Sequence, residues 1–179
     1  MPHQVPQPSP ERMTPFGGGA IVAGVRPGSD PLVALTAAAL ARATGGELFF
    51  AYVDEQRFTE REFPDGTVQH SDFNPDSADE SWRRVEARLQ DEVGALLAGS
   101  GLPWQLRYLA GRPDRSLTHL ARAVDAAVIV VGNRAPEHGA KVREFLDGAL
   151  ALKLAQHQHR PVLAVPLSVV DWKAPMPWA

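Results

Sequence analysis

The chain has no cysteine among its 179 residues. This absence excludes disulfide scaffolds, zinc–thiolate sites, iron–sulfur clusters and thiol nucleophiles. No apolar run approaches the roughly 20 residues that a membrane span needs, and residues 1–19 lack the basic-then-apolar order of a secretory signal. We therefore expect a cytoplasmic protein without a membrane partner.

An excess of positive charge is also lacking, since the net charge is −3 and the pI is about 6.1. Dedicated nucleic-acid binders usually carry a basic face, so no nucleic-acid partner is expected. The charge is unevenly placed: residues 54–80 hold nine acids and two bases, a net charge of −7. The remainder carries +4, so an acidic insert lies in a mildly basic domain.

Proline is concentrated at the two ends of the chain. Five of the 16 prolines lie in residues 1–19, and two more lie at positions 175 and 177. Such segments rarely pack into a core. We predict a disordered N-terminal arm over 1–19, one domain over 20–168 that includes the acidic insert, and a C-terminal tail over 169–179.

Short apolar runs without alternation predict strands that are buried on both faces. They lie at 20–25, 48–53 and 126–131, while 104–109 alternates and 162–165 closes the domain. Between them, helices are predicted at about 31–44, from the capping box at 77–80 to residue 99, from 114 to about 124, and at about 144–157. Alternating strands and helices predict an α/β, Rossmann-like fold: an open, twisted, five-stranded parallel sheet in three layers, with helices on both faces.

The acidic insert interrupts this alternation. Its centre, 63–67 (Phe-Pro-Asp-Gly-Thr), is a tight-turn signal. The flanks at 59–63 and 67–70 fit an exposed β-hairpin, and a polar loop without regular structure fits them equally well.

Ligands of open parallel sheets bind at the carboxyl ends of the strands, where the strand order reverses. The loops expected there contain no Walker A motif, no G-x-G-x-x-G after the first strand and no G-x-S-x-G nucleophile elbow. Neither a catalytic residue nor a metal site is identified from sequence, so an enzyme is not expected.

The loop after the strand at 126–131 is the strongest candidate for binding. Gly132, Asn133 and Arg134 follow that strand, and Gly139 and Gly148 bracket a basic stretch. Glycines let backbone N–H groups approach a phosphate, and a helix start adds a positive dipole end. A plain turn with tight helix–sheet packing explains the same glycines equally well.

Three segments together resemble the universal stress protein family. They are the opening AIVAGV at 20–25 with its Gly/Ser/Pro turn, the AGRP at 110–113 with DAAVIVVG at 125–132, and the closing HRPVLAV at 159–165. The second resembles the family's G-x-P…ADLIVVG signature and the third its CPVLVV ending. The resemblance covers about 20–165 and implies the adenine nucleotide alpha hydrolase-like fold.

Some members of that family bind ATP through an Asp after the first strand and a Gly-x-x-Gly, nine residues, Gly-Ser/Thr pattern. Here Arg26 stands at the Asp position, and Ala135 stands where the second glycine belongs. Ala149 replaces the hydroxyl residue after Gly148, and the loop is three residues longer than the pattern. A carboxylate and a hydroxyl that contact ligand are thereby lost. The resemblance implies these cofactor-binding candidates: Arg26, Val53 (whose backbone would meet adenine), Gly132, Asn133, Arg134, Gly139, Gly148 and Ala149.

Our leading hypothesis is a non-catalytic stress-response or signalling module with weakened or lost ATP binding. The alternative is a member that binds ATP or AMP, with Mg²⁺, through a rearranged loop around Gly139 and Gly148; slow ATP hydrolysis stays open in that case. An enzyme of the ATP-pyrophosphatase type is a third hypothesis. Its support is slight, because residues 26–30 share only Gly, Ser and Asp with the loop of those enzymes. The family also implies a homodimer through the last strand, 162–165, whose apolar edge needs a partner.

Overall fold

The computed structural model describes residues 7–73, 81–133, 145–169 and 173. Within these residues, seven strands and four α-helices follow one short 3₁₀ helix, η1. The elements are η1 (Pro10–Arg12), β1 (Ala20–Gly24), α1 (Leu32–Thr44), β2 (Leu48–Asp54), β3 (Arg57–Glu62), β4 (Val68–Asp72), α2 (Ser81–Leu96), β5 (Trp104–Ala110), α3 (Pro113–Ala123), β6 (Ala126–Asn133), α4 (Phe145–His157) and β7 (Val162–Pro166).

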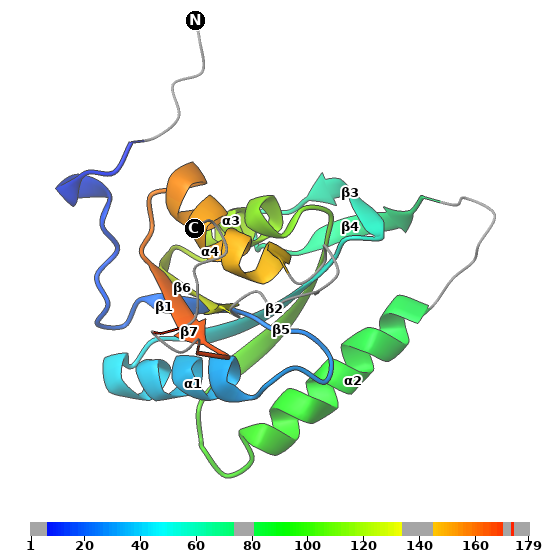
Figure 1. Cartoon of the computed structure of the whole chain (residues 1–179), viewed down its shortest axis with the longest axis horizontal. Coiled ribbons are helices and arrows are strands. Elements are labelled where there is room, and N and C mark those ends of the chain that lie inside the picture. The colour runs from blue at the N-terminus through cyan, green and yellow to red at the C-terminus, as the bar shows by residue number, and fades with distance from the viewer. Residues whose placement is uncertain (1–6, 74–80, 134–144, 170–172, 174–179) are drawn as a thin grey trace, which may run out of the picture.

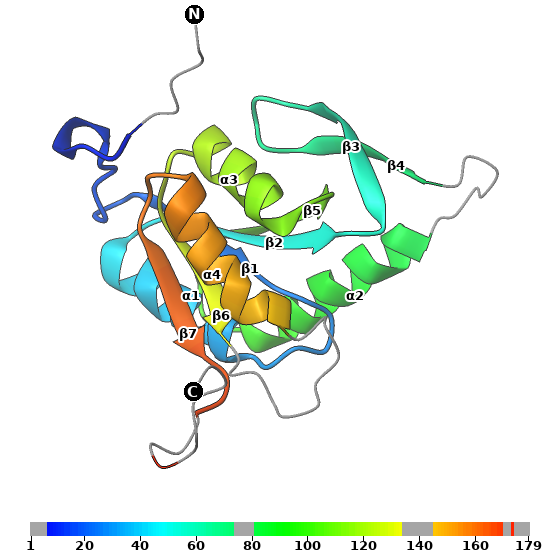
Figure 2. The same ribbon diagram turned by 45° about the horizontal axis from the view of Figure 1, so that its top comes forward.

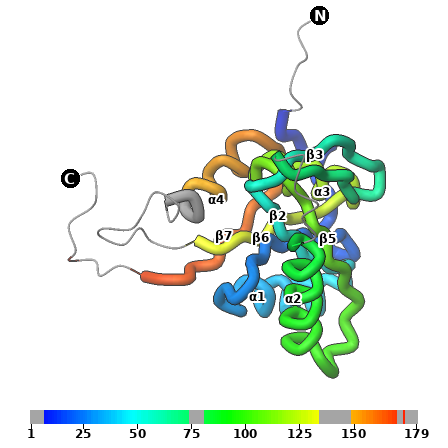
Figure 3. The backbone as a smooth tube through the Cα atoms, turned by 90° about the vertical axis from the view of Figure 1, so that its right-hand side faces the viewer, coloured from blue at the N-terminus to red at the C-terminus, as the bar shows by residue number. Residues whose placement is uncertain are grey.

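Five strands form one parallel sheet in the order β5-β2-β1-β6-β7. Helices α1 and α2 cover one face, and α3 and α4 cover the other (Figures 1 and 3). The predicted three-layer α/β fold is therefore confirmed. Strand β6 continues two residues beyond its predicted end, to Asn133.

Burial on both faces explains why the apolar runs do not alternate. Ile21 and Ala23 belong to the core under α1 and α2, whereas Val22, between them, belongs to the core under α3 and α4. Burying one large aliphatic side chain contributes about 1.5–3 kcal/mol. Because both faces of β1 are packed in this way, the strand is held at the centre of the sheet.

The acidic insert forms the hairpin that the sequence left undecided. Strands β3 and β4 pair antiparallel, with a register irregularity between Thr59 and Arg61. In the turn, the Gly66 N–H donates to the Phe63 C=O (3.0 Å). This hairpin lies beside α3, at the end of the sheet where β2 finishes (Figure 2).

Residues 7–19 lead to β1 and are hydrogen-bonded to the domain. The Thr14 hydroxyl donates to the Asp125 carboxylate (3.0 Å), and the Gly18 N–H donates to the Thr44 C=O (2.8 Å). These bonds tie the segment to the end of the domain opposite the carboxyl ends of the strands.

Candidate functional site

A cleft of about 250 Å³ opens at the carboxyl ends of β1, β2 and β6. Strand β1 has β2 on one side and β6 on the other, so the strand order reverses there. Arg26, Val53 and Gly132, three of the predicted site residues, line this cleft together. The structure thus has a cleft at the position where open parallel sheets bind their ligands.

The backbone of Val53 faces this cleft. In the described part of the chain, the last backbone hydrogen bond between β1 and β2 runs from the Val25 N–H to the Ala51 C=O (2.9 Å). The Asp54 C=O faces the other way and accepts from the Gly111 N–H (2.9 Å). Because alternate residues of a strand point their backbone groups to the same side, the Val53 N–H and C=O point toward β1 beyond its end. A donor and an acceptor therefore lie side by side at the wall of the cleft.

Gly132 has a packing reason to be glycine. A Cβ at this position would lie 2.6 Å from Leu167 Cδ1 and 3.3 Å from Val33 Cγ2. The tight-packing interpretation of this glycine is confirmed, and its contact with a phosphate stays a prediction.

The other predicted residues are placed differently. Asn133 is exposed, and its C=O accepts from the Leu167 N–H (2.8 Å), so its backbone C=O is committed to the β7 side. Ala149 lies half-buried in α4, and the next residue, Leu150, reaches the cleft instead. Gly148 is the fourth residue of α4, as expected near the helix start. Arg134 and Gly139 lie outside the described residues.

Two acidic residues that line the cleft, Asp30 and Glu55, were not among the predicted binding residues. The Asp30 carboxylate accepts from the Leu32 N–H (2.9 Å) at the start of α1. Glu55 is exposed and follows β2 directly. Its place in the acidic insert, immediately after a predicted strand, was the signal for this position.

A smaller pocket of about 100 Å³ adjoins the cleft and contains more positive charge. Arg26, Arg112 and Lys153 line it together with Glu55 and Asp114. Arg112 Nη2 lies 2.7 Å from Asp114 Oδ2. Burial acts to raise the pKa of Asp114, but the hydrogen bond and charge of Arg112 outweigh it and hold the pKa below its usual value. Asp114 is thus a carboxylate at neutral pH, and it offsets one of the three cations.

A model of the universal stress protein family, Usp, matches residues 20–166. The chain belongs to this family. No curated protein sequence matches the chain.

Solved universal stress proteins share this fold. One from Archaeoglobus fulgidus in complex with dAMP is 19% identical, with a TM-score of 0.56; the match covers 82% of this chain and 97% of that one. One from Burkholderia pseudomallei is 20% identical, with a TM-score of 0.56, and the match covers 83% and 96% of the two chains. A universal stress protein in complex with cAMP is 21% identical, with a TM-score of 0.52, covering 85% and 99%.

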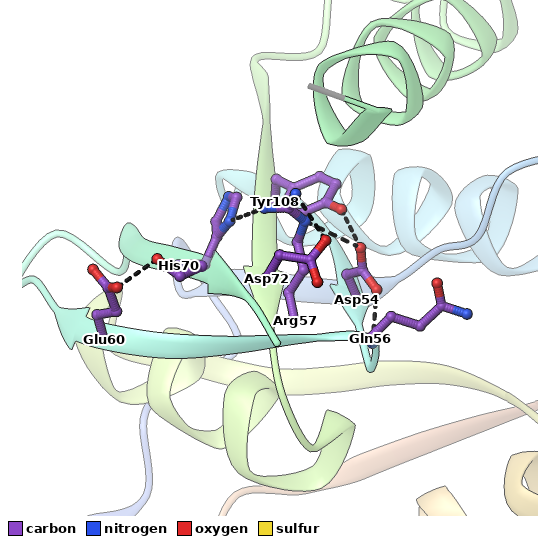
Figure 4. Close-up of polar contacts among 8 residues, drawn as sticks. Asp54, Gln56, Arg57, Glu60, His70, Asp72 and Tyr108 are labelled. Carbon is purple, nitrogen blue, oxygen red and sulfur yellow. Dashed lines mark hydrogen bonds and ion pairs between the residues drawn. The ribbon is translucent and has the colours of Figure 1, made fainter. Parts of the chain in front are cut away.

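The hairpin of this universal stress protein is joined to the sheet by a polar cluster at the end of β2 (Figure 4). Arg57 is buried, and its guanidinium lies 3.9 Å from the Asp54 carboxylate and 3.7 Å from that of Asp72. Asp54 also accepts from the Tyr108 hydroxyl (2.5 Å), and Arg57 Nη1 lies 3.3 Å from His70 Nδ1. One buried cation therefore links β2, β3 and β4.

Burial shifts the titration of two groups in this cluster. It lowers the pKa of His70, with the nearby Arg57 cation acting in the same direction. Burial and the hydrogen bond to Asp54 raise the pKa of Tyr108. His70 also lies edge-on to Trp82 of α2, with ring centroids 4.9 Å apart. A neutral imidazole and a protonated phenol are thus the favoured forms where the hairpin meets β5 and α2.

A second contact fixes the loop after β1. The Glu92 carboxylate of α2 accepts from the Gly28 N–H (3.0 Å) and from Arg88 Nε (2.7 Å). Both bonds lower the pKa of Glu92, and the bond from Gly28 has the larger effect. The loop that carries Arg26 is thereby tied to α2.

The described residues contain no group of three or more His, Asp or Glu side chains arranged to hold a metal ion. None of the helices in the described part of the chain is long and apolar enough to cross a membrane.

Proposed function

We propose that this universal stress protein is a non-catalytic stress-response or signalling module whose cleft binds an adenine mononucleotide and binds ATP only weakly. The observation that carries the proposal is the pair of backbone groups of Val53 at the cleft wall. An N–H beside a C=O matches the ring nitrogen and exocyclic amino group on the Watson–Crick edge of adenine. Val25, Ala51 and Leu117 supply apolar surface for the flat ring.

The size and charge of the cleft favour one phosphate over three. Its volume of about 250 Å³ lies just below the usual range for ligand pockets, which is roughly 300–1,000 Å³. The carboxylates of Asp30 and Glu55 line it, and like charges repel, so each added phosphate charge would meet more repulsion there. Arg26, Arg112 and Lys153 in the adjoining pocket supply enough positive charge for a single phosphate.

The structural relatives support the ligand class. Two of them are complexes with cAMP and with dAMP, each an adenine nucleotide with one phosphate. No general base for hydrolysis is assigned in the cleft. A nucleotide held there by backbone groups suits a binding function, and hydrolysis is not part of the proposal.

Calorimetric titration of the full chain with AMP and with ATP–Mg²⁺ tests the proposal. We expect AMP to bind at least about tenfold more tightly than ATP–Mg²⁺, a difference of about 1.4 kcal/mol. Micromolar or tighter binding of ATP–Mg²⁺, or no binding of AMP, would contradict it. The former result would favour the alternative, in which the loop around Gly139 and Gly148 is rearranged to hold three phosphates.

A proline substitution isolates the backbone contribution. Val53→Pro deletes the N–H that faces the cleft, and no sheet hydrogen bond is lost because β1 has already ended. Val53→Ala is the matched control, since it trims the side chain and keeps the N–H. We expect Val53→Pro to lose AMP binding and Val53→Ala to retain it, with folding of both checked by circular dichroism.

We also propose a homodimer that forms through β7. This strand is at the edge of the sheet, with β6 on its other side. Leu163 and Ala164 of β7 are exposed in the single chain. An apolar edge strand of this kind is a template for pairing with another strand, and a second copy offers the same edge.

A further inference from the structure

A second, larger cavity lies between the hairpin and the start of α3. Its volume is about 610 Å³, well within the usual range for ligand pockets. Glu55 lines both this cavity and the cleft, so the two openings share one wall. Residues of the hairpin form one side, and residues 110–116 form the other.

Most charged groups around this cavity are already committed. Arg57 pairs with Asp54 and Asp72, and Arg112 pairs with Asp114. Glu60 accepts from Gln69 and Ser71, and Glu62 lies 3.2 Å from His119 Nδ1.

Arg115 differs from these residues. It lines the cavity from the first turn of α3, its side chain is exposed, and no ion pair of it is found among residues 7–73, 81–133, 145–169 and 173. A guanidinium presents several N–H donors in a planar fork that fits a carboxylate. The cavity therefore offers one uncommitted cation to an anion.

Two exposed aromatic rings form another part of the cavity wall. The exposed fractions of Phe58 and Phe73 are 39% and 68%, although the segment around them is polar and acidic. Their ring centroids lie 5.4 Å apart, and their planes are tilted by 43°. Tilted aromatic pairs leave ring faces and edges available to a third ring, and each such contact is worth about 0.5–1.5 kcal/mol beyond area burial.

The walls of the cavity are held in place before any ligand arrives. The hydroxyls of Thr59 and Ser116 both donate to the Ala110 C=O, each at 2.9 Å, from opposite sides of the cavity. At the hairpin turn, Gly66 packs directly on Leu120 of α3. Preorganisation of this kind reduces the entropic cost of binding.

We propose that this second cavity binds a small aromatic carboxylate, with its ring against Phe58 and Phe73 and its carboxylate on Arg115. This site does not depend on the nucleotide proposal, because its residues other than Glu55 and Arg112 lie outside the cleft and the smaller pocket that adjoins it. Occupancy of both openings would place two ligands on either side of Glu55.

Titration of the full chain with 2-naphthoate, followed by ¹H–¹⁵N NMR shifts, tests this site. The neutral 2-naphthamide has the same ring and no charge, so we expect it to bind at least about tenfold more weakly. Arg115→Gln is expected to weaken 2-naphthoate binding by a similar factor. Arg122→Gln, an exposed arginine in the last turn of the same helix, is the matched control and is expected to leave binding unchanged.

A further variant tests the aromatic wall, and retained shift dispersion shows that each variant is folded. We expect Phe58→Ala to weaken 2-naphthoate binding and to leave AMP binding unchanged. The proposal is overturned if 2-naphthoate does not bind at millimolar concentration, if the amide binds equally well, or if Arg115→Gln binds as the wild type does. A failure of AMP to bind would contradict the nucleotide proposal alone.

Discussion

Replacing Gly66 by alanine is expected to separate the hairpin from α3. Gly66 is buried at the hairpin turn with φ of +84°, and a Cβ there would lie 2.5 Å from Leu120 Cδ1 and 3.4 Å from Ala123 Cβ. Leu120 has no exposed surface and packs in the core under α3 and α4, so its side chain has no room to retreat. The methyl group therefore forces either the core or the hairpin to move.

The magnitude follows from two separable costs. A left-handed backbone conformation costs alanine about 1–2 kcal/mol relative to glycine, and overpacking a core costs about 1–3 kcal/mol. Gly45→Ala provides the matched control, because Gly45 has φ of +71° and nothing within 4 Å of its would-be Cβ. We expect a loss of about 1–2 kcal/mol for Gly45→Ala and of about 2–5 kcal/mol for Gly66→Ala.

Urea unfolding of both variants measures the global losses, and hydrogen exchange of the β3 and β4 amides measures local opening. If the hairpin separates as one unit, its amides exchange faster in Gly66→Ala while those of β1 and β6 keep their protection. Equal destabilisation by the two substitutions, together with unchanged exchange in the hairpin, would refute the packing argument. It would also show that the wall of the second cavity is not held by this contact.

Three further predictions concern pH, assembly and ligand choice. Burial keeps the pKa of His70 below its usual value, so the unfolded state binds more protons and stability decreases as pH falls below about 6.5. His70→Gln should flatten this pH dependence of stability, measured by urea unfolding between about pH 7.5 and 5.5. An unchanged slope would exclude His70 as its source. Leu163→Lys on β7 should give a monomeric mass by light scattering, whereas Leu152→Lys, at an exposed leucine of α4, should not. A dimer that survives Leu163→Lys would rule out the β7 edge as the dimer interface. Glu55→Gln should strengthen ATP–Mg²⁺ binding more than AMP binding in calorimetry, and equal changes would show that its charge does not select between them.

The sheet and its helices were predictable because their signals are local. Uninterrupted apolar runs require burial on both faces, and glycine, proline and capping residues mark where each element begins and ends. At the start of α1, for example, the Asp30 carboxylate accepts the Leu32 N–H. The structure places β7 at the edge of the sheet, the position on which the proposed pairing with a second copy depends.

The candidate site was less predictable, because its residues are far apart in the sequence and come together only in the folded chain. Arg26, Val53 and Gly132 were expected at the cleft, but Asp30 and Glu55 were not among the predicted binding residues. Local sequence explains Asp30 as a residue at the start of a helix, so nothing in the pattern pointed to a second role.

The acidic insert shows the difference most clearly. Its composition allowed a loop or a hairpin, and the choice depends on contacts more than 50 residues away, such as that of Thr59 with Ala110. Only tertiary structure brings Arg57 between Asp54 and Asp72, or sets the hairpin turn against Leu120.

The sequence by itself determined the family, the three-layer fold and the end of the sheet where ligands are expected. Those properties follow from periodicity and motifs that short stretches of chain carry. The tertiary structure decided that the insert is a docked hairpin, that the Val53 N–H and C=O face the cleft, and that a second cavity lies beside it. These features arise from packing between distant segments, where close contact and burial fix the positions that local preference leaves open.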